Sequence, residues 1–178
     1  ANTLHKDTRH KTVRQHLFVK EGQPLNPFRL ADNERFLRNT DFILDSRIIV
    51  LPVDDTDSVD VTVITRDVFS LGATMGGSFP TAPKVGIYDA NVDGRAQRIQ
   101  FTALIDADRS PNFGYSLYYR KSSLFGSLAN LELGYSQINT GVSIGEEPEF
   151  AVLMRLNRPL VSPCSRWAGG VEVSRNWS

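Results

Sequence analysis

The clearest candidate for metal chemistry in this sequence is the run DANVDG at residues 89–94. Oxygen-bearing side chains at alternate positions, followed by a glycine that permits a sharp turn, form the first half of a calcium-binding loop. The twelfth position of such a loop would be Gln100, whose amide does not offer the bidentate carboxylate that the ion needs. The residues after Gly94 also alternate like a strand, whereas a calcium loop leads into a helix. The pattern therefore favours a solvated loop between two strands over a calcium site.

The histidines and the densest acidic cluster do not form a catalytic or metal-binding pattern. His5, His10 and His16 are spaced so that no two of them share a helical face at positions i and i+4. We expect these histidines to be exposed or to lie on a helix surface. The acidic cluster at residues 146–149 contains a proline and follows a glycine, which is typical of an exposed loop where like charges stay hydrated.

The remaining reactive residues and the overall charge exclude several classes of protein. Cys164 is the only cysteine, which excludes an internal disulfide and a multi-cysteine metal site. The glycine-rich stretch at residues 71–77 lacks the Lys-Ser/Thr pair of a phosphate-binding loop. Lys and Arg together number 20, as do Asp and Glu, so no net charge attracts the chain to nucleic acid. We expect no enzyme activity, no cofactor, no metal and no nucleic-acid partner.

The first 67 residues show the order helix, helix, strand, strand. Apolar residues recur about one turn apart over residues 12–19, which predicts a first helix. A second helix is predicted over residues 26–38, where Asn26 is a suitable cap and Pro27 suits the first position. Two strands are expected to follow, at residues 42–53 and 58–68, joined by an acidic turn.

The remainder of the chain alternates apolar and polar residues with a period of two. In the segment RIQFTALID at residues 98–106, for example, Ile99 and Phe101 share one face while Gln100 and Thr102 share the other. This pattern predicts about six strands, at residues 68–79, 95–107, 112–121, 127–138, 148–158 and 166–177. Most are about ten residues long, which matches the length that a tilted strand needs to cross a bilayer.

An alternating sheet needs an apolar partner for its oily face, and two partners fit the pattern. Lipid fits if the strands belong to a membrane barrel, whose polar interior would suit the small and polar residues of the other face. Aromatic residues near strand ends, such as Phe113, Tyr135 and Trp177, would then form interfacial girdles. The alternative is a soluble antiparallel sandwich, a binding or structural module in which two such faces pack together.

Several phrases of the sequence resemble a known family. They are Glu21-Gly22 after the first helix, Glu34-Arg35-Phe36-Leu37-Arg38 in the second, Phe42-Ile43 opening a strand, and Val59-Asp60-Val61 leading to Thr65-Arg66-Asp67. This succession resembles the last POTRA repeat of BamA-like outer-membrane assembly factors of Gram-negative bacteria. The segment GYSLYYRKSSLFGSLANLELGYS, with Leu124-Phe125-Gly126 at its turn, resembles the early barrel hairpin of that superfamily.

The resemblance implies an α+β module followed by an all-β part. Residues 1–67 would be a POTRA-like periplasmic module, and residues 68–178 the N-terminal part of an outer-membrane β-barrel. The first POTRA strand should precede Thr12, where Leu4 supplies little apolar character, so that strand is expected to be missing or altered. Since about six strands would leave the barrel incomplete, we expect a fragment that self-associates through its open sheet edges.

The resemblance also implies a role in inserting outer-membrane proteins or translocating polypeptides. The expected partners are unfolded outer-membrane protein clients, accessory assembly proteins and the lipid bilayer. In the implied POTRA fold, one strand lies at a sheet edge and could accept an extended client by strand addition. The residues of this client-binding edge are Arg47, Ile48, Ile49, Val50 and Leu51. A proline in place of Ile49 is expected to remove one backbone donor and to disturb the edge.

Overall fold

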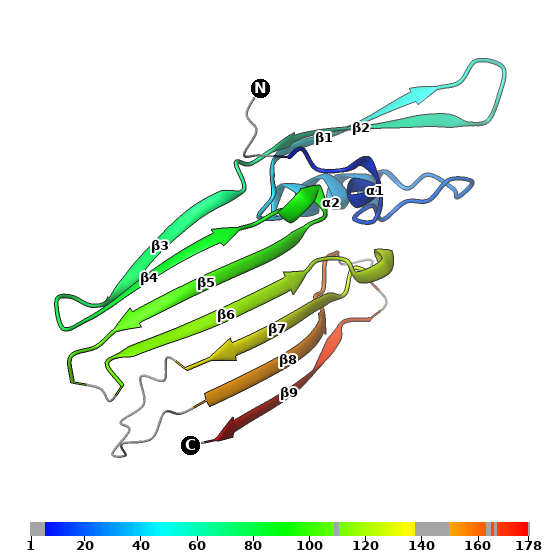
Figure 1. Ribbon diagram of the computed structural model, residues 1–178. Coiled ribbons are helices and arrows are strands. Elements are labelled where there is room, and N and C mark those ends of the chain that lie inside the picture. The colour runs from blue at the N-terminus through cyan, green and yellow to red at the C-terminus, as the bar shows by residue number, and fades with distance from the viewer. Residues whose placement is uncertain (1–5, 109–110, 138–149, 163–164, 166, 178) are drawn as a thin grey trace.

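The computed structural model describes residues 6–108, 111–137, 150–162, 165 and 167–177 (Figure 1). Two short helices, α1 (His10–Arg14) and α2 (Pro27–Arg38), precede all of the strands. The strands are β1 (Ile43–Pro52), β2 (Val59–Asp67), β3 (Leu71–Ser78), β4 (Ala82–Asp89), β5 (Gln97–Ile105), β6 (Phe113–Lys121), β7 (Asn130–Ser136), β8 (Phe150–Arg158) and β9 (Gly169–Trp177). Short 3₁₀ turns, η1 (Val92–Gly94) and η2 (Leu124–Gly126), follow β4 and β6.

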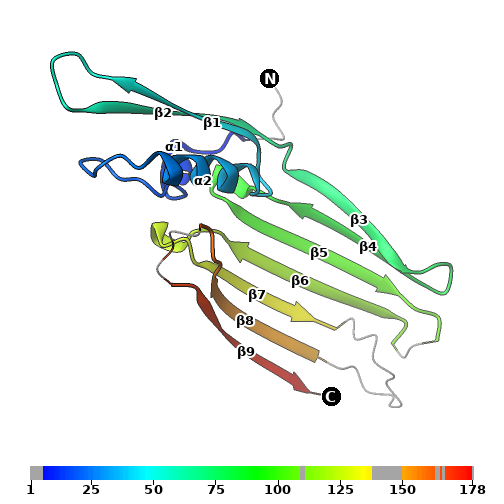
Figure 2. The same ribbon diagram turned by 180° about the vertical axis from the view of Figure 1, so that it is seen from behind.

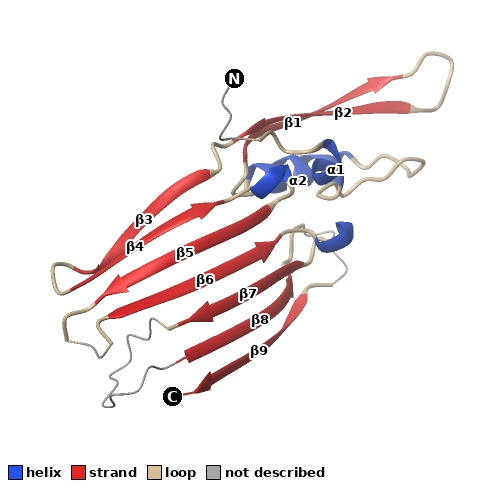
Figure 3. Cartoon of the chain, in the orientation of Figure 1, coloured by secondary structure: helices blue, strands red, loops and turns tan. Residues whose placement is uncertain are grey.

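The strands form two antiparallel sheets in which each strand neighbours the next one along the chain. β1 pairs with β2, and β3 to β9 form a seven-stranded sheet in sequence order. This larger sheet is open, because β3 and β9 lie at its two edges. Among the described residues no second sheet is stacked on it (Figure 3), so they do not form the alternative sandwich. The expectation of a mainly antiparallel β protein with two short helices is confirmed.

The sequence pattern missed one strand, β4, so that the large sheet has seven described strands instead of about six. Proline and glycine interrupt the alternation in APKVGIYD, and both residues are usually depleted from strands. The sheet has a local reason for Gly86: a β-carbon there would lie 2.5 Å from Thr74 Oγ1 on β3 and 3.0 Å from Thr102 Oγ1 on β5. Crowding by side chains of the neighbouring strands therefore requires a glycine at position 86, and this glycine is one reason why the sequence pattern did not indicate β4.

The second helix begins as predicted, whereas the first is shorter than expected. The Asn26 side chain accepts hydrogen bonds from the backbone N–H groups of Phe28 (3.0 Å) and Arg29 (3.3 Å). α1 ends at Arg14 because the following backbone bonds to a different element. The buried Asn33 of α2 accepts from the Phe18 N–H (2.8 Å) and donates to the His16 carbonyl (2.9 Å). These backbone groups therefore bond to α2 and do not continue α1.

A small core joins the helices to the large sheet. Leu37, Phe42 and Ile43 are almost completely buried and pack against Ala96, which lies between η1 and β5. In both views the helices lie between the two-stranded sheet and one end of the seven-stranded sheet (Figure 2). Neither helix is long and apolar enough to cross a membrane, as judged over the described residues. The core therefore positions the helical part at a single end of the strands.

Candidate functional site

One face of the seven-stranded sheet is apolar and uncovered. The strand register places apolar residues side by side, as for Met75 beside Val85 and Leu133 beside Met154. Their exposure is high for such side chains, reaching 84% at Met75 and 53% at Met154. Other exposed members of this face include Ile87, Ile105, Leu117, Leu156, Val171 and Val173. A contiguous apolar surface of this kind is characteristic of an interaction site and not of an ordinary water-facing surface.

Aromatic rings form a row across this face at the end of the sheet that is farther from the helices. Tyr115 lies 5.6 Å from Tyr135, ring centre to ring centre, and Tyr135 lies 6.3 Å from Phe150. Phe150 and Trp177 complete the row at 5.9 Å. β8 begins at Phe150 and β9 ends at Trp177, at the end of the sheet away from the helices (Figure 1). The apolar face is thus bordered by aromatic side chains on one side.

The opposite face of the sheet is polar and carries cross-strand ion pairs. Arg155 on β8 pairs with Glu132 on β7 (3.3 Å) and with Glu172 on β9 (2.6 Å). Near the other edge, the Arg98 guanidinium lies 4.2 Å from the ring centre of Tyr88. Each of these residues is adjacent along its strand to one on the apolar face, because side chains alternate. The two faces therefore differ in polarity.

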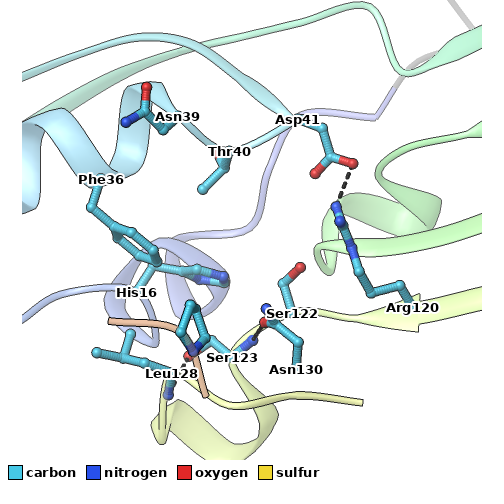
Figure 4. Close-up of a pocket in the computed structure, with 11 residues that line it drawn as sticks. His16, Phe36, Asn39, Thr40, Asp41, Arg120, Ser122, Ser123, Leu128 and Asn130 are labelled. Atoms are coloured by element: carbon cyan, nitrogen blue, oxygen red, sulfur yellow. Dashed lines mark hydrogen bonds and ion pairs between the residues drawn. The ribbon is translucent and has the colours of Figure 1, made fainter. Parts of the chain in front are cut away.

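At the end nearest the helices, the polar face meets the helical part through Asp41. Its carboxylate accepts hydrogen bonds from Arg98 (3.3 Å) on β5 and from Arg120 on β6. A cavity of about 270 Å³ lies beside this cluster, lined by His16, Phe36, Asn39, Ser122 and other residues (Figure 4). Both α2 and the turn after β6 contribute to its walls. The junction between the two parts of the chain is consequently polar and hollowed.

His16 lines this cavity and is buried, so the expectation of a surface histidine is wrong for this residue; His10 is exposed as expected, and His5 lies outside the described residues. The ring nitrogen Nδ1 lies 2.7 Å from the Thr12 carbonyl oxygen, and the ring contacts Phe42 edge to face. Burial lowers the pKa of His16 below its ordinary value. Its other nitrogen, Nε2, has no hydrogen-bond partner in the described part of the chain.

The DANVDG run lies between two strands, but it is a docking surface and not a solvated loop. Asn91 is buried, and its side chain accepts from the Ala96 N–H (2.8 Å) and donates to Thr8 Oγ1 (2.8 Å). The Asp93 carboxylate pairs with Lys6 (2.7 Å) and Arg9, which lower its pKa. Of the residues that suggested a calcium loop, Asp93 through its oxygens and Asn91 through its amide nitrogen therefore bind the N-terminal segment, defined here as residues 6–12, whereas Asp89 Oδ1 accepts from the Asn91 N–H (2.9 Å) within the loop.

Gly94 completes this docking surface. Its carbonyl oxygen accepts from the Arg9 N–H (3.0 Å) and from Thr12 Oγ1 (2.9 Å). A β-carbon at Gly94 would lie 2.3 Å from the Asp7 carbonyl oxygen, so the backbones approach too closely for any other residue. On the neighbouring turn, Ser123 Oγ donates to the Gln15 carbonyl. Two turns of the large sheet therefore hold the start of the helical part.

The predicted client-binding edge, Arg47 to Leu51, lies within β1. The side chains of Arg47, Ile49 and Leu51 are exposed, whereas those of Ile48 and Val50 are half-buried on the face beneath α2. β1 has a neighbouring strand on one side only, β2. The structure thus places all five residues on an edge strand of the two-stranded sheet.

Two side chains of α2 already occupy part of this edge. Glu34 Oε2 accepts from the backbone N–H of Ile48 (2.9 Å), and Arg38 Nη1 donates to the carbonyl of Ser46 (3.1 Å). Arg38 Nη1 also donates to Glu34 Oε1 (2.7 Å). The hydrogen bond from Ile48 lowers the pKa of Glu34. Sequence reasoning missed this pair, although the i, i+4 spacing of Glu34 and Arg38 was a signal that they interact.

The direction of these bonds specifies which side of β1 a proline at Ile49 would affect. Backbone groups of successive residues in a strand point to opposite sides. Since the Ile48 N–H points away from β2 to Glu34, the Ile49 N–H points toward β2. Proline at Ile49 would therefore break the β1–β2 ladder, and Val50 is the residue whose N–H lies on the free edge.

The structure describes no group of three or more His, Cys, Asp or Glu side chains that could hold a metal ion. The acidic cluster at residues 146–149 and Cys164 lie outside the described residues. No family model matches the chain, and no curated protein matches it either. No relative therefore assigns a role to the residues described above.

Proposed function

We propose that the chain belongs to an outer-membrane protein, with the apolar face of the seven-stranded sheet in lipid and the polar face toward a barrel interior. The observation that carries this proposal is the pairing of an uncovered apolar face with a polar, ion-paired face on the same strands. Water penalises such an apolar face, whereas hydrocarbon does not. The aromatic row fits a girdle at one membrane interface.

The strand dimensions support the same placement. β5, β6, β8 and β9 each contain 9 residues. At about 3.3 Å per residue each strand is about 30 Å long, so at a barrel tilt of about 40° it covers about 23 Å, close to the apolar band of about 25 Å of an outer-membrane barrel. The helices lie beyond one end of the strands, where a water-exposed module belongs. In this proposal residues 1–67 are a POTRA-like module on the periplasmic side, and residues 68–178 are barrel strands.

The role that fits this arrangement is assembly or translocation of polypeptides at the outer membrane. An extended client, such as an unfolded outer-membrane protein, would add to the free edge of β1 beside Arg47 to Leu51. Main-chain hydrogen bonds would give affinity that tolerates many client sequences, without a cofactor. The outer edges of β3 and β9 would pair with further strands or with another copy of the chain, and accessory proteins would bind the exposed parts of the module.

Arginine substitutions on adjacent residues of β8 test the membrane placement. Met154 lies on the apolar face and Leu153 on the polar face of the same strand. Arginine facing lipid near the bilayer centre costs about 2–4 kcal/mol, whereas a charge facing a hydrated interior costs little. The chain is folded into phosphatidylcholine vesicles and then titrated with urea. The free energy of unfolding should be lowered far more by Met154→Arg than by Leu153→Arg. Equal behaviour of the two variants would refute the lipid-facing assignment.

A further inference from the structure

Two backbone groups on the free edge of β1 are bonded to a donor and an acceptor from a helix. Glu34 and Arg38 lie one turn apart on α2, and both reach the backbone of β1. The Glu34 carboxylate accepts a hydrogen bond from the Ile48 N–H, as a carbonyl oxygen of a neighbouring strand would. The Arg38 guanidinium donates a hydrogen bond to the Ser46 carbonyl, as a backbone N–H of a neighbouring strand would. Together the two side chains imitate the backbone of a paired strand.

We propose that Glu34 and Arg38 form a removable cap on the β1 edge, and that an extended polypeptide pairs with β1 only by displacing both side chains. This inference rests on the proposed capture of clients at the same edge. The pair is exposed enough to move, with 25% of the Glu34 side chain and 42% of the Arg38 side chain accessible. The ion pair between them survives displacement, so no charge is left without a partner.

The cap also explains why this edge can exist without uncontrolled pairing. An uncovered edge strand is a template for aggregation, and charged side chains are a common protection. A permanent cover would abolish client binding, whereas two side chains compete with a client at only two backbone groups. The Val50 N–H, next along the free side, remains as a starting point for a client strand. The cap thus selects for clients that form several backbone bonds at once.

Binding of a fluorescent peptide to three variants tests the cap. The probe is a peptide with the sequence GGVEVSRNW of residues 169–177, and the control probe carries N-methyl groups at alternate backbone nitrogens, which prevents strand pairing. Glu34→Ala and Arg38→Ala each remove one competing bond and should tighten binding by roughly tenfold. Arg35→Ala removes an arginine of the same helix that pairs with Asp32 instead of β1, and should leave binding unchanged.

Amide hydrogen exchange at Ile48 accompanies the binding measurement. We expect faster exchange in Glu34→Ala than in the parent chain, and an intermediate rate in Glu34→Gln, which retains a carbonyl acceptor. If the parent chain, Glu34→Ala, Arg38→Ala and Arg35→Ala all bind the peptide equally strongly, the cap is overturned while client capture remains intact. Binding that is absent in every variant, or equal for the N-methylated probe, would overturn client capture itself and the cap with it.

Discussion

Replacing Gly94 with alanine should detach the N-terminal segment from the large sheet. Gly94 has a positive φ of 66°, and its missing β-carbon leaves room for the Asp7 carbonyl oxygen, which would otherwise lie at 2.3 Å. A left-handed conformation costs alanine about 1 kcal/mol relative to glycine. The clash with Asp7 also breaks the two hydrogen bonds that the Gly94 carbonyl accepts, which adds about 1 kcal/mol each to the cost of the substitution. The total is about 3 kcal/mol.

Gly22 offers a matched control for this change. Its φ of 75° is similar, but no atom lies within 4 Å of the position that a β-carbon would take. Alanine at Gly22 should therefore cost only the conformational part, about 1 kcal/mol. The remaining difference of about 2 kcal/mol corresponds to roughly a thirtyfold rise in opening of the N-terminal segment.

Limited trypsin digestion in detergent micelles measures this opening, because Lys6, Arg9 and Lys11 all lie in the N-terminal segment. Cleavage at these three positions should be roughly thirty times faster in Gly94→Ala than in Gly22→Ala, while cleavage within the large sheet stays unchanged. Equal cleavage rates in the two variants would refute the docking of this segment on Gly94.

Two further predictions concern the core and the buried histidine. Leu37→Ala should lower the free energy of unfolding by about 2–5 kcal/mol in a urea titration, because Leu37 is fully buried, whereas Phe28→Ala on the exposed side of α2 should change it little. Burial lowers the pKa of His16 below 6.5, so the unfolded chain binds the proton more readily than the folded chain. The contribution of His16 to the free energy of unfolding is therefore fully present above pH 6.5 and is lost as the pH falls below it. Urea midpoints at pH 7.5 and 5.5 should show this loss, and a His16→Gln variant that loses as much over the same interval would contradict it.

Much of the fold was predictable because its sequence signals are local. Asn26 followed by Pro27 marks the start of α2, and the structure confirms that cap. Period-two alternation found most strands of the large sheet, since successive side chains of a strand point to opposite faces. It failed at β4, where the need for Gly86 arises from side chains on the neighbouring strands.

The candidate site was harder to predict, because its bonds join residues that are distant in sequence. The proposed client-binding residues lie on β1, one of the two edge strands of the small sheet, and the bond from Ile48 to Glu34 depends on how α2 packs over that sheet. The DANVDG run has the composition of an ion site, yet its partners Lys6 and Arg9 lie more than 80 residues earlier. His16 was misplaced for the same reason, since it is buried against Phe36 of α2 and against Phe42, which precedes β1.

The docking of the N-terminal segment has a mechanical consequence. A pulling force applied to the chain ahead of Lys6 would first meet the ion pairs with Asp93, which precedes β5. The load would therefore pass into the turn between β4 and β5 before it strained the helices. The turn between β4 and β5 thus anchors the start of the chain to the seven-stranded sheet.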